Sequence, residues 1–238
     1  MKSIRILALL AAAILLSLSP GHVRTAFGQQ RGEQPVAAGS ATKRQIAPAM
    51  SYVYADWLTR PERQREELPD RLVAALEIPE RATVIDLGAG VGYFTWRLAK
   101  HVGPTGKVIA TDIQQEMIDL LEGNLRRRGI ENVEMVLSTQ EDARLPEGTA
   151  DLALLVDVYH ELAYPARTMR AVRRALKPHG RLVIVEYRKE DPDIPIHHLH
   201  KMTVAEVRSE IEPTGFELLE VMDFLPSQHV IVFTPEPR

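Results

Sequence analysis

The chain has 238 residues, of which 45% are hydrophobic and 26% are charged, and its formal net charge is −3 at pH 7. This composition is ordinary for a globular protein and excludes a collagen, a coiled coil, a polytopic membrane protein and a wholly disordered chain. The slightly acidic balance argues against a nucleic-acid-binding protein that relies on bulk positive charge. The chain has no cysteine, which excludes disulfides, thiolate metal sites and a cysteine nucleophile.

The N-terminus has the layout of a secretory signal peptide. Lys2 and Arg5 precede an apolar run over residues 6–19, and small residues at Ala26-Phe27-Gly28 suit cleavage. As a helix the apolar run spans roughly 21 Å, which is shorter than the ~30 Å hydrocarbon core of a bilayer. We therefore predict a signal peptide over residues 1–28, no stable membrane span after cleavage, and a periplasmic or secreted protein. The alternative is a membrane anchor that stays uncleaved.

Two segments are predicted between the signal and the main domain. Residues 29–50 are rich in Gln, Gly, Ser and Pro without an apolar period, which predicts a flexible linker. Residues 51–80 are predicted to form a helical cap over the carboxyl edge of a sheet, with a helix start at Thr59–Glu62 and a break at Pro69. Either a lid over a small substrate or packing onto the sheet would account for three aromatic residues of the cap, Tyr52, Tyr54 and Trp57.

From residue 81 onward, β-rich and helical segments alternate. Strands are predicted at residues 83–87, 107–112, 133–137, 151–157 and 181–187. Helices are predicted at residues 93–101 and 166–176, and a further helix contains residues 117–125 and ends at Gly129. A turn is predicted at residues 177–180. Strands joined by helices of this length pair in parallel and have helices on both faces. The pattern therefore predicts an α/β fold with a Rossmann-like, doubly wound sheet.

The end of the chain follows a different pattern. Thr203 and Glu206 form a capping box that opens a helix, and Gly215 ends it. Two strands at residues 216–225 and 229–233 follow, separated by three residues. So short a link forces an antiparallel hairpin. The predicted sheet thus has seven strands, mostly parallel, with a C-terminal antiparallel hairpin.

A glycine-rich loop joins the first predicted strand to the first helix. Gly88, Gly90 and Gly92 allow tight turns and close approach of a ligand, and the following helix start offers free N–H groups. The spacing is G-x-G-x-G, whereas the dinucleotide fingerprint is G-x-G-x-x-G. Asp86, two residues before the loop, would repel a pyrophosphate and attract an ammonium or sulfonium. These features disfavour a nicotinamide-dependent oxidoreductase.

Further carboxylates follow the later strands. Asp112 ends the second strand, where a carboxylate can accept both hydroxyls of a ribose. Glu141 and Asp142 follow the third strand, where one of them can accept from an adenine amine. Asp157 ends the fourth strand. Because ligands of open α/β sheets bind at the carboxyl edge, these side chains are expected around one crevice.

The segment Asp86–Gly92 resembles the first motif of class I S-adenosylmethionine-dependent methyltransferases. Asp112 and the segments 141–146, 156–162 and 176–180 resemble the later motifs in order, so that the resemblance covers about residues 70–235. It implies a methyltransferase domain over residues 81–238 with S-adenosylmethionine as cofactor. It implies that the glycine loop and Asp86 hold the amino-acid end of the cofactor. The cofactor-binding residues that it implies are Asp86, Gly88, Ala89, Gly90, Gly92, Asp112, Ile113, Glu141, Asp142, Ala143 and Asp157.

Methyl transfer needs alignment above all, and a general base only where the acceptor loses a proton. His160 is the predicted catalytic base; the alternative is a helix-start histidine satisfied by its neighbours. A second cluster follows the fifth strand and either contacts the substrate, joins His160 or Glu161 around a metal, or is a solvated loop. Its members are Asp191, Asp193, His197, His198 and His200. No metal is included in the predicted site.

We predict from these features a methyltransferase that acts on a small molecule, because the connection after the fifth strand is short and no nucleic-acid or protein acceptor is indicated. The alternative is an exported, non-catalytic binding protein that retains the fold. The predicted export is in tension with the cofactor, which is made in the cytoplasm. The sequence carries no signal for the oligomeric state.

Overall fold

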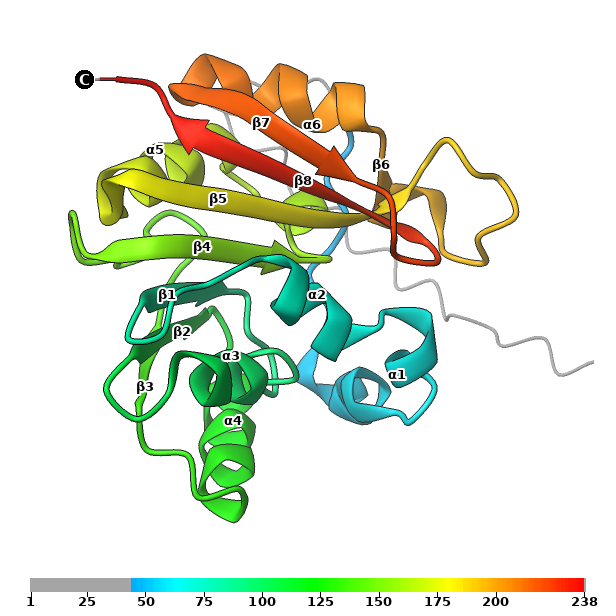
Figure 1. Ribbon diagram of the computed structural model, residues 1–238. Helices are drawn as coiled ribbons and strands as arrows, with labels where there is room; N and C mark the ends of the chain where they lie inside the picture. The colour runs from blue at the N-terminus through cyan, green and yellow to red at the C-terminus, as the bar shows by residue number, and fades with distance from the viewer. Residues whose placement is uncertain (1–43, 238) are drawn as a thin grey trace, which may run out of the picture. The chain divides into compact units, whose positions relative to one another are not determined.

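One eight-stranded sheet organises the chain in the computed structural model, which describes residues 44–237 (Figure 1). Seven strands follow the order β3-β2-β1-β4-β5-β8-β7, and β6 pairs with β5 alone. The strands are β1 (Thr83–Leu87), β2 (Lys107–Asp112), β3 (Val133–Leu137), β4 (Ala150–Val156), β5 (Leu176–Arg188), β6 (Lys201–Met202), β7 (Phe216–Met222) and β8 (Gln228–Pro235). The predicted α/β fold is confirmed. The two-residue β6 was not predicted, since it is too short to show a pattern.

The strand pairing confirms the mostly parallel sheet with an antiparallel end. β1 pairs in parallel with β2 and β4, β2 pairs in parallel with β3, and β4 pairs in parallel with β5. β8 runs antiparallel between β5 and β7. The predicted seven-stranded path therefore exists, and the carboxyl ends of the parallel strands share one edge.

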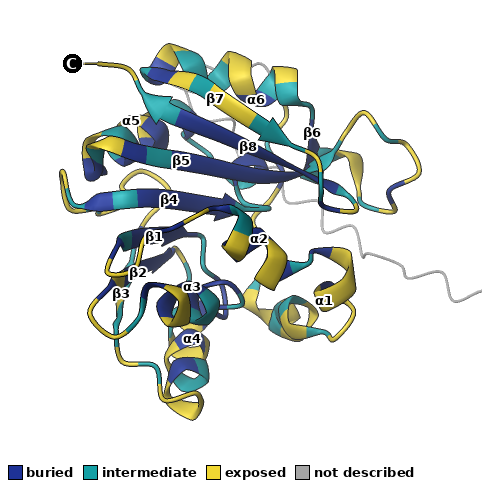
Figure 2. Ribbon diagram, viewed as in Figure 1, coloured by how far each residue is buried: buried dark blue, intermediate teal, exposed yellow. Residues whose placement is uncertain are grey.

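Helices cover both faces of the sheet, as the continuously apolar strands predict. The helical elements are η1 (Tyr52–Thr59), α1 (Arg63–Glu66), α2 (Pro69–Ala75), α3 (Thr95–Val102), α4 (Gln115–Arg127), η2 (Tyr159–Glu161), α5 (Pro165–Ala175), η3 (His198–His200), α6 (Val204–Ile211) and η4 (Glu212–Thr214). In β4, Leu152 and Leu154 pack with residues of α2 and α3, whereas Ala153 and Leu155 pack with residues of α5 and α6. This is the two-residue period of a strand. Figure 2 shows β4 and β8 as largely buried, whereas the edge strand β7 is partly exposed.

Local sequence signals set several element ends. Thr203 accepts a hydrogen bond from Glu206 N, and the Glu206 side chain accepts one from Thr203 N, so the predicted capping box opens α6. Gly215 follows η4 in the left-handed conformation that glycine adopts without strain. Pro69 occupies the first turn of α2, where its missing N–H costs nothing.

Two predicted boundaries differ from the structure. The predicted turn at residues 177–180 lies within β5, where Ala150 pairs with Leu176 but Leu152 pairs with Arg181. Residues 177–180 therefore form a bulge opposite a single residue of β4, Asp151. The helix predicted at Tyr93 begins at Thr95, because the glycine-rich loop continues further before the helix can start.

The predicted cap consists of short helices, η1, α1 and α2. Its three aromatic residues are not packed onto the sheet, since Tyr52, Tyr54 and Trp57 are 42%, 61% and 44% exposed. The alternative, a lid over a small substrate, stays a prediction. The helix start predicted at Thr59–Glu62 is wrong. Thr59 ends η1, and α1 begins at Arg63 without a side-chain cap.

The first described residues, 44–50, lie against the carboxyl edge of the sheet. Arg44 Nη1 donates to the His160 carbonyl at 2.8 Å and Arg44 Nη2 to the Tyr159 carbonyl at 3.1 Å. Ala47 N donates to the same His160 carbonyl at 3.2 Å. The segment predicted as a linker over residues 29–50 therefore ends in packed residues. The predicted signal peptide, residues 1–28, lies outside the described residues, and between residues 44 and 237 no helix is long and apolar enough to cross a membrane.

Candidate functional site

A cleft lies at the carboxyl ends of β1, β2 and β4. Its cavity volume is about 140 Å³, and it opens to solvent at its mouth. Six of the predicted cofactor residues line it: Gly88, Gly90, Asp112, Ile113, Ala143 and Asp157. The remaining predicted residues lie behind the wall of the cleft or away from it.

The glycine-rich loop has a backbone that other residues would not tolerate. Gly88 and Gly92 have φ of +74° and +84°. A Cβ at Gly88 would lie 2.6 Å from Val158 Cγ2, and one at Gly92 would lie 2.3 Å from Leu121 Cδ1. The N–H groups of Gly88 and Ala89 both donate to the Thr111 carbonyl of β2 at 2.9 Å. Gly88 and Ala89 thus hold the loop on the sheet, and Gly88 and Gly90 line the cleft.

Asp112 is the carboxylate best placed for a ligand. Its Oδ2 accepts from Gly90 N and its Oδ1 accepts from Gln114 N, both at 2.9 Å. Burial raises the pKa of Asp112, although the backbone N–H groups of Gln114, Gly90 and Ile113 counteract it. A carboxylate offers about four acceptor positions, so two remain for ligand hydroxyls.

Asp86 lies in β1 directly before the glycine-rich loop. It is 4% exposed and does not line the cleft. Its Oδ2 accepts from Thr95 Oγ1 at 2.6 Å, which fixes the start of α3. Burial raises the pKa of Asp86 to about 6; the Thr95 bond lowers it and the nearby charge of Asp112 raises it. Asp86 therefore fixes the start of α3 behind the glycine-rich loop, and its predicted role at the amino-acid end of the cofactor stays a prediction.

The acidic pair after β3 also lies away from the cleft. Glu141 Oε2 pairs with Arg167 Nη1 at 3.3 Å, and Asp142 Oδ1 accepts from Arg144 N at 2.9 Å. Ser138, Thr139 and Gln140 line the cleft in their place. Neither carboxylate is brought to the cleft wall, so the predicted adenine contact stays a prediction without geometric support.

Asp157 is a half-buried acid that directly follows β4. Its φ is +53°, a left-handed conformation that is rare for aspartate. Its Oδ2 accepts from Gln228 Nε2 at 2.8 Å, and its Oδ1 is buried with no hydrogen-bond partner among the described residues. Burial raises the pKa of Asp157 well above its usual value, and the neighbouring Glu67 and Glu186 add to this.

His160 belongs to a cluster beside the cleft. It is 2% exposed and does not line the cleft, whereas its neighbour Glu161 does. His160 Nδ1 lies 2.5 Å from Glu186 Oε2, and His160 Nε2 lies 2.9 Å from His200 Nδ1. Burial lowers the pKa of His160, but the Glu186 carboxylate outweighs it and raises the pKa overall. The arrangement can hold a cation between the two rings.

Comparison with known proteins bears on what this cleft holds. Residues 78–222, well over half of the chain, match the family model described as "Methyltransferase domain". The chain belongs to this methyltransferase family. Members of this family are class I methyltransferases, which use S-adenosylmethionine as cofactor.

Two similar relatives are ubiquinone/menaquinone biosynthesis C-methyltransferases named UbiE. The protein of Pasteurella multocida is 30% identical over 155 residues, which cover 62% of this chain and 58% of the relative. The protein of Escherichia fergusonii is 35% identical over 108 residues, which cover 45% of this chain and 43% of the relative. The chain thus spans about half the length of these relatives. A solved S-adenosylmethionine-dependent methyltransferase from Aquifex aeolicus is 26% identical, with a TM-score of 0.75 over 79% of this chain and 100% of that one.

The cleft suits the cofactor of this family. Asp112 keeps free acceptor positions for two ribose hydroxyls, and the exposed side chain of Ile113, at 38%, offers an apolar surface for an adenine ring. A Cβ at Gly90 would lie 3.1 Å from Leu58 Cδ1, so a side chain there would narrow the cleft. The two acids Asp86 and Asp112 favour a sulfonium in their vicinity.

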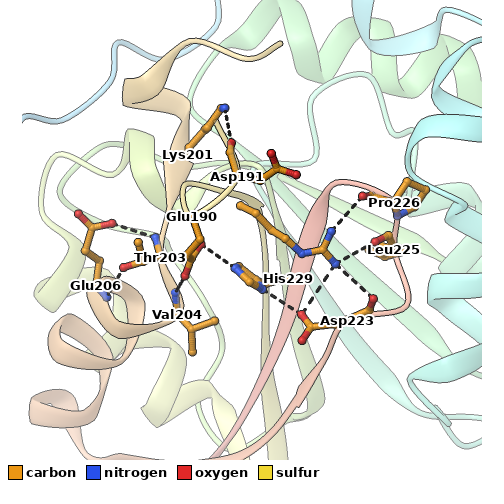
Figure 3. Close-up of polar contacts among 11 residues, drawn as sticks. Glu190, Asp191, Lys201, Thr203, Val204, Glu206, Asp223, Leu225, Pro226 and His229 are labelled. Carbon is orange, nitrogen blue, oxygen red and sulfur yellow. Dashed lines mark hydrogen bonds and ion pairs between the residues drawn. The ribbon is translucent and has the colours of Figure 1, made fainter. Parts of the chain in front are cut away.

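The second predicted cluster is only partly brought to the site. Of its histidines, His200 reaches His160, while His197 and His198 are exposed. The loop that carries them is fixed at its root (Figure 3). His229 Nε2 lies 2.9 Å from Glu190 Oε2, and Lys201 Nζ donates to the Asp191 and Ile194 carbonyls at 3.1 and 2.6 Å. Asp191 accepts from Asp193 N within the loop.

Two residues of the site were not predicted. Gln114 lines the cleft and ties it to the cap, since its Oε1 accepts from Tyr52 N and its Nε2 donates to the Met50 carbonyl. Glu186 orients His160 from the carboxyl end of β5. The rule that placed Asp112 and Asp157 at strand ends would also have found Glu186.

Proposed function

We propose that this protein transfers the methyl group of S-adenosylmethionine to a small-molecule acceptor. The observation that carries the proposal is Asp112, a cleft carboxylate held by Gly90 N and Gln114 N with acceptor positions to spare. The cofactor brings an activated methyl group and its own leaving group. The contribution of the chain is binding, orientation and exclusion of water.

The residues of the chain divide these tasks. Asp112 would orient the ribose, and the loop from Gly88 to Gly90 would let the cofactor approach the backbone. Leu58, Val158 and Leu162 line the cleft with apolar surface that excludes water. His160 keeps its predicted role as a base only as part of the proposal. Because it does not line the cleft, the proposal does not depend on it.

A calorimetric titration of the full chain with S-adenosylmethionine tests the cofactor site. Asp112→Ala should weaken binding by about 10-fold to 100-fold, because it removes a charge-assisted contact. Asp119→Ala is the matched control, since its exposed carboxylate bonds Gln115 Nε2 on the same helix and does not line the cleft. An absence of binding by folded protein, or equal losses in the two variants, would refute the assignment.

The names of the relatives guide the choice of acceptors to assay. Because the UbiE proteins are named ubiquinone/menaquinone biosynthesis C-methyltransferases, we propose quinone precursors as the first acceptors to assay. The apolar cleft wall is compatible with such rings. Incubation with methyl-labelled cofactor and extraction of labelled product tests this. Labelling of a different small molecule would retain the methyltransferase and replace the acceptor.

Export remains part of the proposal. We propose that residues 1–28 are a cleaved signal and that the protein is periplasmic or secreted. Mass spectrometry of the native N-terminus tests it: a start near Gln29 supports cleavage, and retention of Lys2 contradicts it. The alternative function, a non-catalytic binding protein, predicts cofactor binding without turnover of any acceptor.

A further inference from the structure

A buried histidine and an imidazole from a distant loop meet a carboxylate beside the cleft. The three ligand atoms are His160 Nε2, His200 Nδ1 and Glu161 Oε1, and they lie within 4.8 Å of one another. Methyl transfer as proposed above does not depend on any of these side chains. Because they come from two segments 40 residues apart, chain proximity does not explain the meeting.

The spacing of the three atoms fits a metal ion. His160 Nε2 lies 2.9 Å from His200 Nδ1 and 3.9 Å from Glu161 Oε1, and the latter two atoms are 3.8 Å apart. The point equidistant from all three is about 2.1 Å from each, and Zn–N bonds measure about 2.0–2.1 Å. Two histidines and one glutamate form a known zinc ligand set that leaves a fourth position open.

Glu186 prepares His160 to act as a ligand. Its side chain is fully buried, its Oε2 lies 2.5 Å from His160 Nδ1, and its Oε1 accepts from His160 N at 3.2 Å. A carboxylate at Nδ1 places the ring proton there and leaves the Nε2 lone pair free. Metal-binding histidines almost always have such a carboxylate or carbonyl partner. With that tautomer, the Nε2 lone pair faces His200 Nδ1 and the Glu161 carboxylate, so that either a proton of His200 or a metal ion can lie between these atoms.

The backbone on both sides of the cluster is held in place. Arg44 and Ala47 bond the His160 carbonyl, and the loop that ends at His200 is anchored by Lys201 and by Glu190 with His229 (Figure 3). Ligands on fixed segments bind a metal with less loss of conformational entropy. The cluster is therefore built before an ion arrives.

We propose that His160, Glu161 and His200 form a binding site for a divalent transition-metal ion of the zinc type, with Glu186 as the positioning residue of His160. The site goes beyond the proposed methyl transfer and does not rest on it. Since Glu161 also lines the cleft, the ion would sit in the wall that separates the cleft from the 190–200 loop.

The test measures bound metal, independent of any enzyme activity. The untagged full chain is stripped with a chelator, incubated with ZnCl₂, passed through gel filtration and analysed for zinc per chain. Wild type should retain one Zn²⁺ per chain. Glu186→Gln should weaken binding by about 10-fold to 100-fold, as for other partners of metal-binding histidines. His200→Ala removes one of the metal ligands and should weaken zinc binding at least as much as Glu186→Gln does.

His198→Ala is the matched control, because it removes an exposed histidine from the same turn. It should retain zinc as wild type does. Circular dichroism verifies that each variant is folded. The proposal is overturned if wild type retains no zinc, which would leave a shared proton between the two rings as the explanation of their contact. The proposal is also overturned if His200→Ala retains zinc as wild type does, or if His198→Ala loses as much bound zinc as His200→Ala.

Discussion

The two halves of the carboxyl edge are assembled in different ways. The half with the glycine-rich loop and Asp112 is built from backbone groups, with N–H donors of Gly90 and Gln114 on one carboxylate. The half around His160 is built from side chains, with Glu186 and His200 each 2.5–2.9 Å from a ring nitrogen. A site made by backbone groups is encoded by a short, contiguous sequence motif. A site made by side chains depends on where distant segments meet.

The largest effect is expected where the backbone-made half is broken. Gly92→Ala should destabilise the protein by about 3 kcal/mol, because the new Cβ would lie 2.3 Å from Leu121 Cδ1 at a φ of +84°. Urea denaturation measures the loss. Gly148→Ala is the control, since its φ is +65° with no atom within 4 Å, and it should cost only about 1 kcal/mol of backbone strain. Equal losses would mean that the contact with Leu121 is relieved by movement of that side chain.

The same half should show a pH signature. Asp86 has a folded pKa of about 6 against 3.8 for an unperturbed group. The folded state therefore holds the proton more tightly, and this contribution to stability is present below about pH 3.8 and lost as the pH rises through 6. Asp86→Asn should raise the free energy of unfolding at pH 7.5 by at most about 3 kcal/mol, and should change it little at pH 3.5. A pH-independent difference would show that the hydrogen bond to Thr95, and not the charge, dominates.

The stability of the half around His160 should fall when Arg44, which lies outside the sheet, is replaced. Arg44→Ala removes the bonds to the His160 and Tyr159 carbonyls and the ion pair with Glu210 at 3.0 Å. A loss of about 1–2 kcal/mol is expected, with faster hydrogen exchange over residues 44–50 and 159–161. Cofactor affinity should stay within about 2-fold of wild type. A large loss of cofactor affinity would show that the two halves are coupled.

The smallest effect is expected where the cap meets the cleft. Gln114→Ala removes the side-chain bonds to Tyr52 N and the Met50 carbonyl, at a cost of about 1 kcal/mol. The backbone bond from Gln114 N to Asp112 remains, so Asp112 should keep its orientation. Titration calorimetry should show cofactor binding weakened by a few-fold at most. A loss as large as that of Asp112→Ala would make the cap part of the cofactor site.

Prediction from the sequence succeeded where the determinants are local. The strand–loop–helix of Val84–Phe94 and the capping box of Thr203 depend on residues a few positions apart. The parallel pairing and the antiparallel hairpin followed from connection lengths, whereas the order of the strands in the sheet was not predicted. Six of eleven predicted cofactor residues line the cleft, and these follow strand ends or belong to the glycine-rich loop.

The remaining positions depend on distant contacts that no local pattern encodes. Glu141 turns to Arg167 of α5, and Asp86 turns to Thr95 across the loop. The meeting of His160 with His200 was one of three alternatives for the 191–200 cluster, because nothing in the spacing indicates which histidine the loop presents. The packed position of residues 44–50 was hidden by a composition typical of linkers.

The position of β8 has a consequence for how the protein reaches its native state. β8 lies between β5 and β7, although both of those strands precede it along the chain. Until residues 228–235 are in place, the apolar strand Leu182–Val185 has an unpaired edge, and an unpaired apolar edge is a template for aggregation. The antiparallel end of the sheet therefore closes by insertion of its latest strand. The interval before insertion is the stage at which a holding chaperone would protect this chain most.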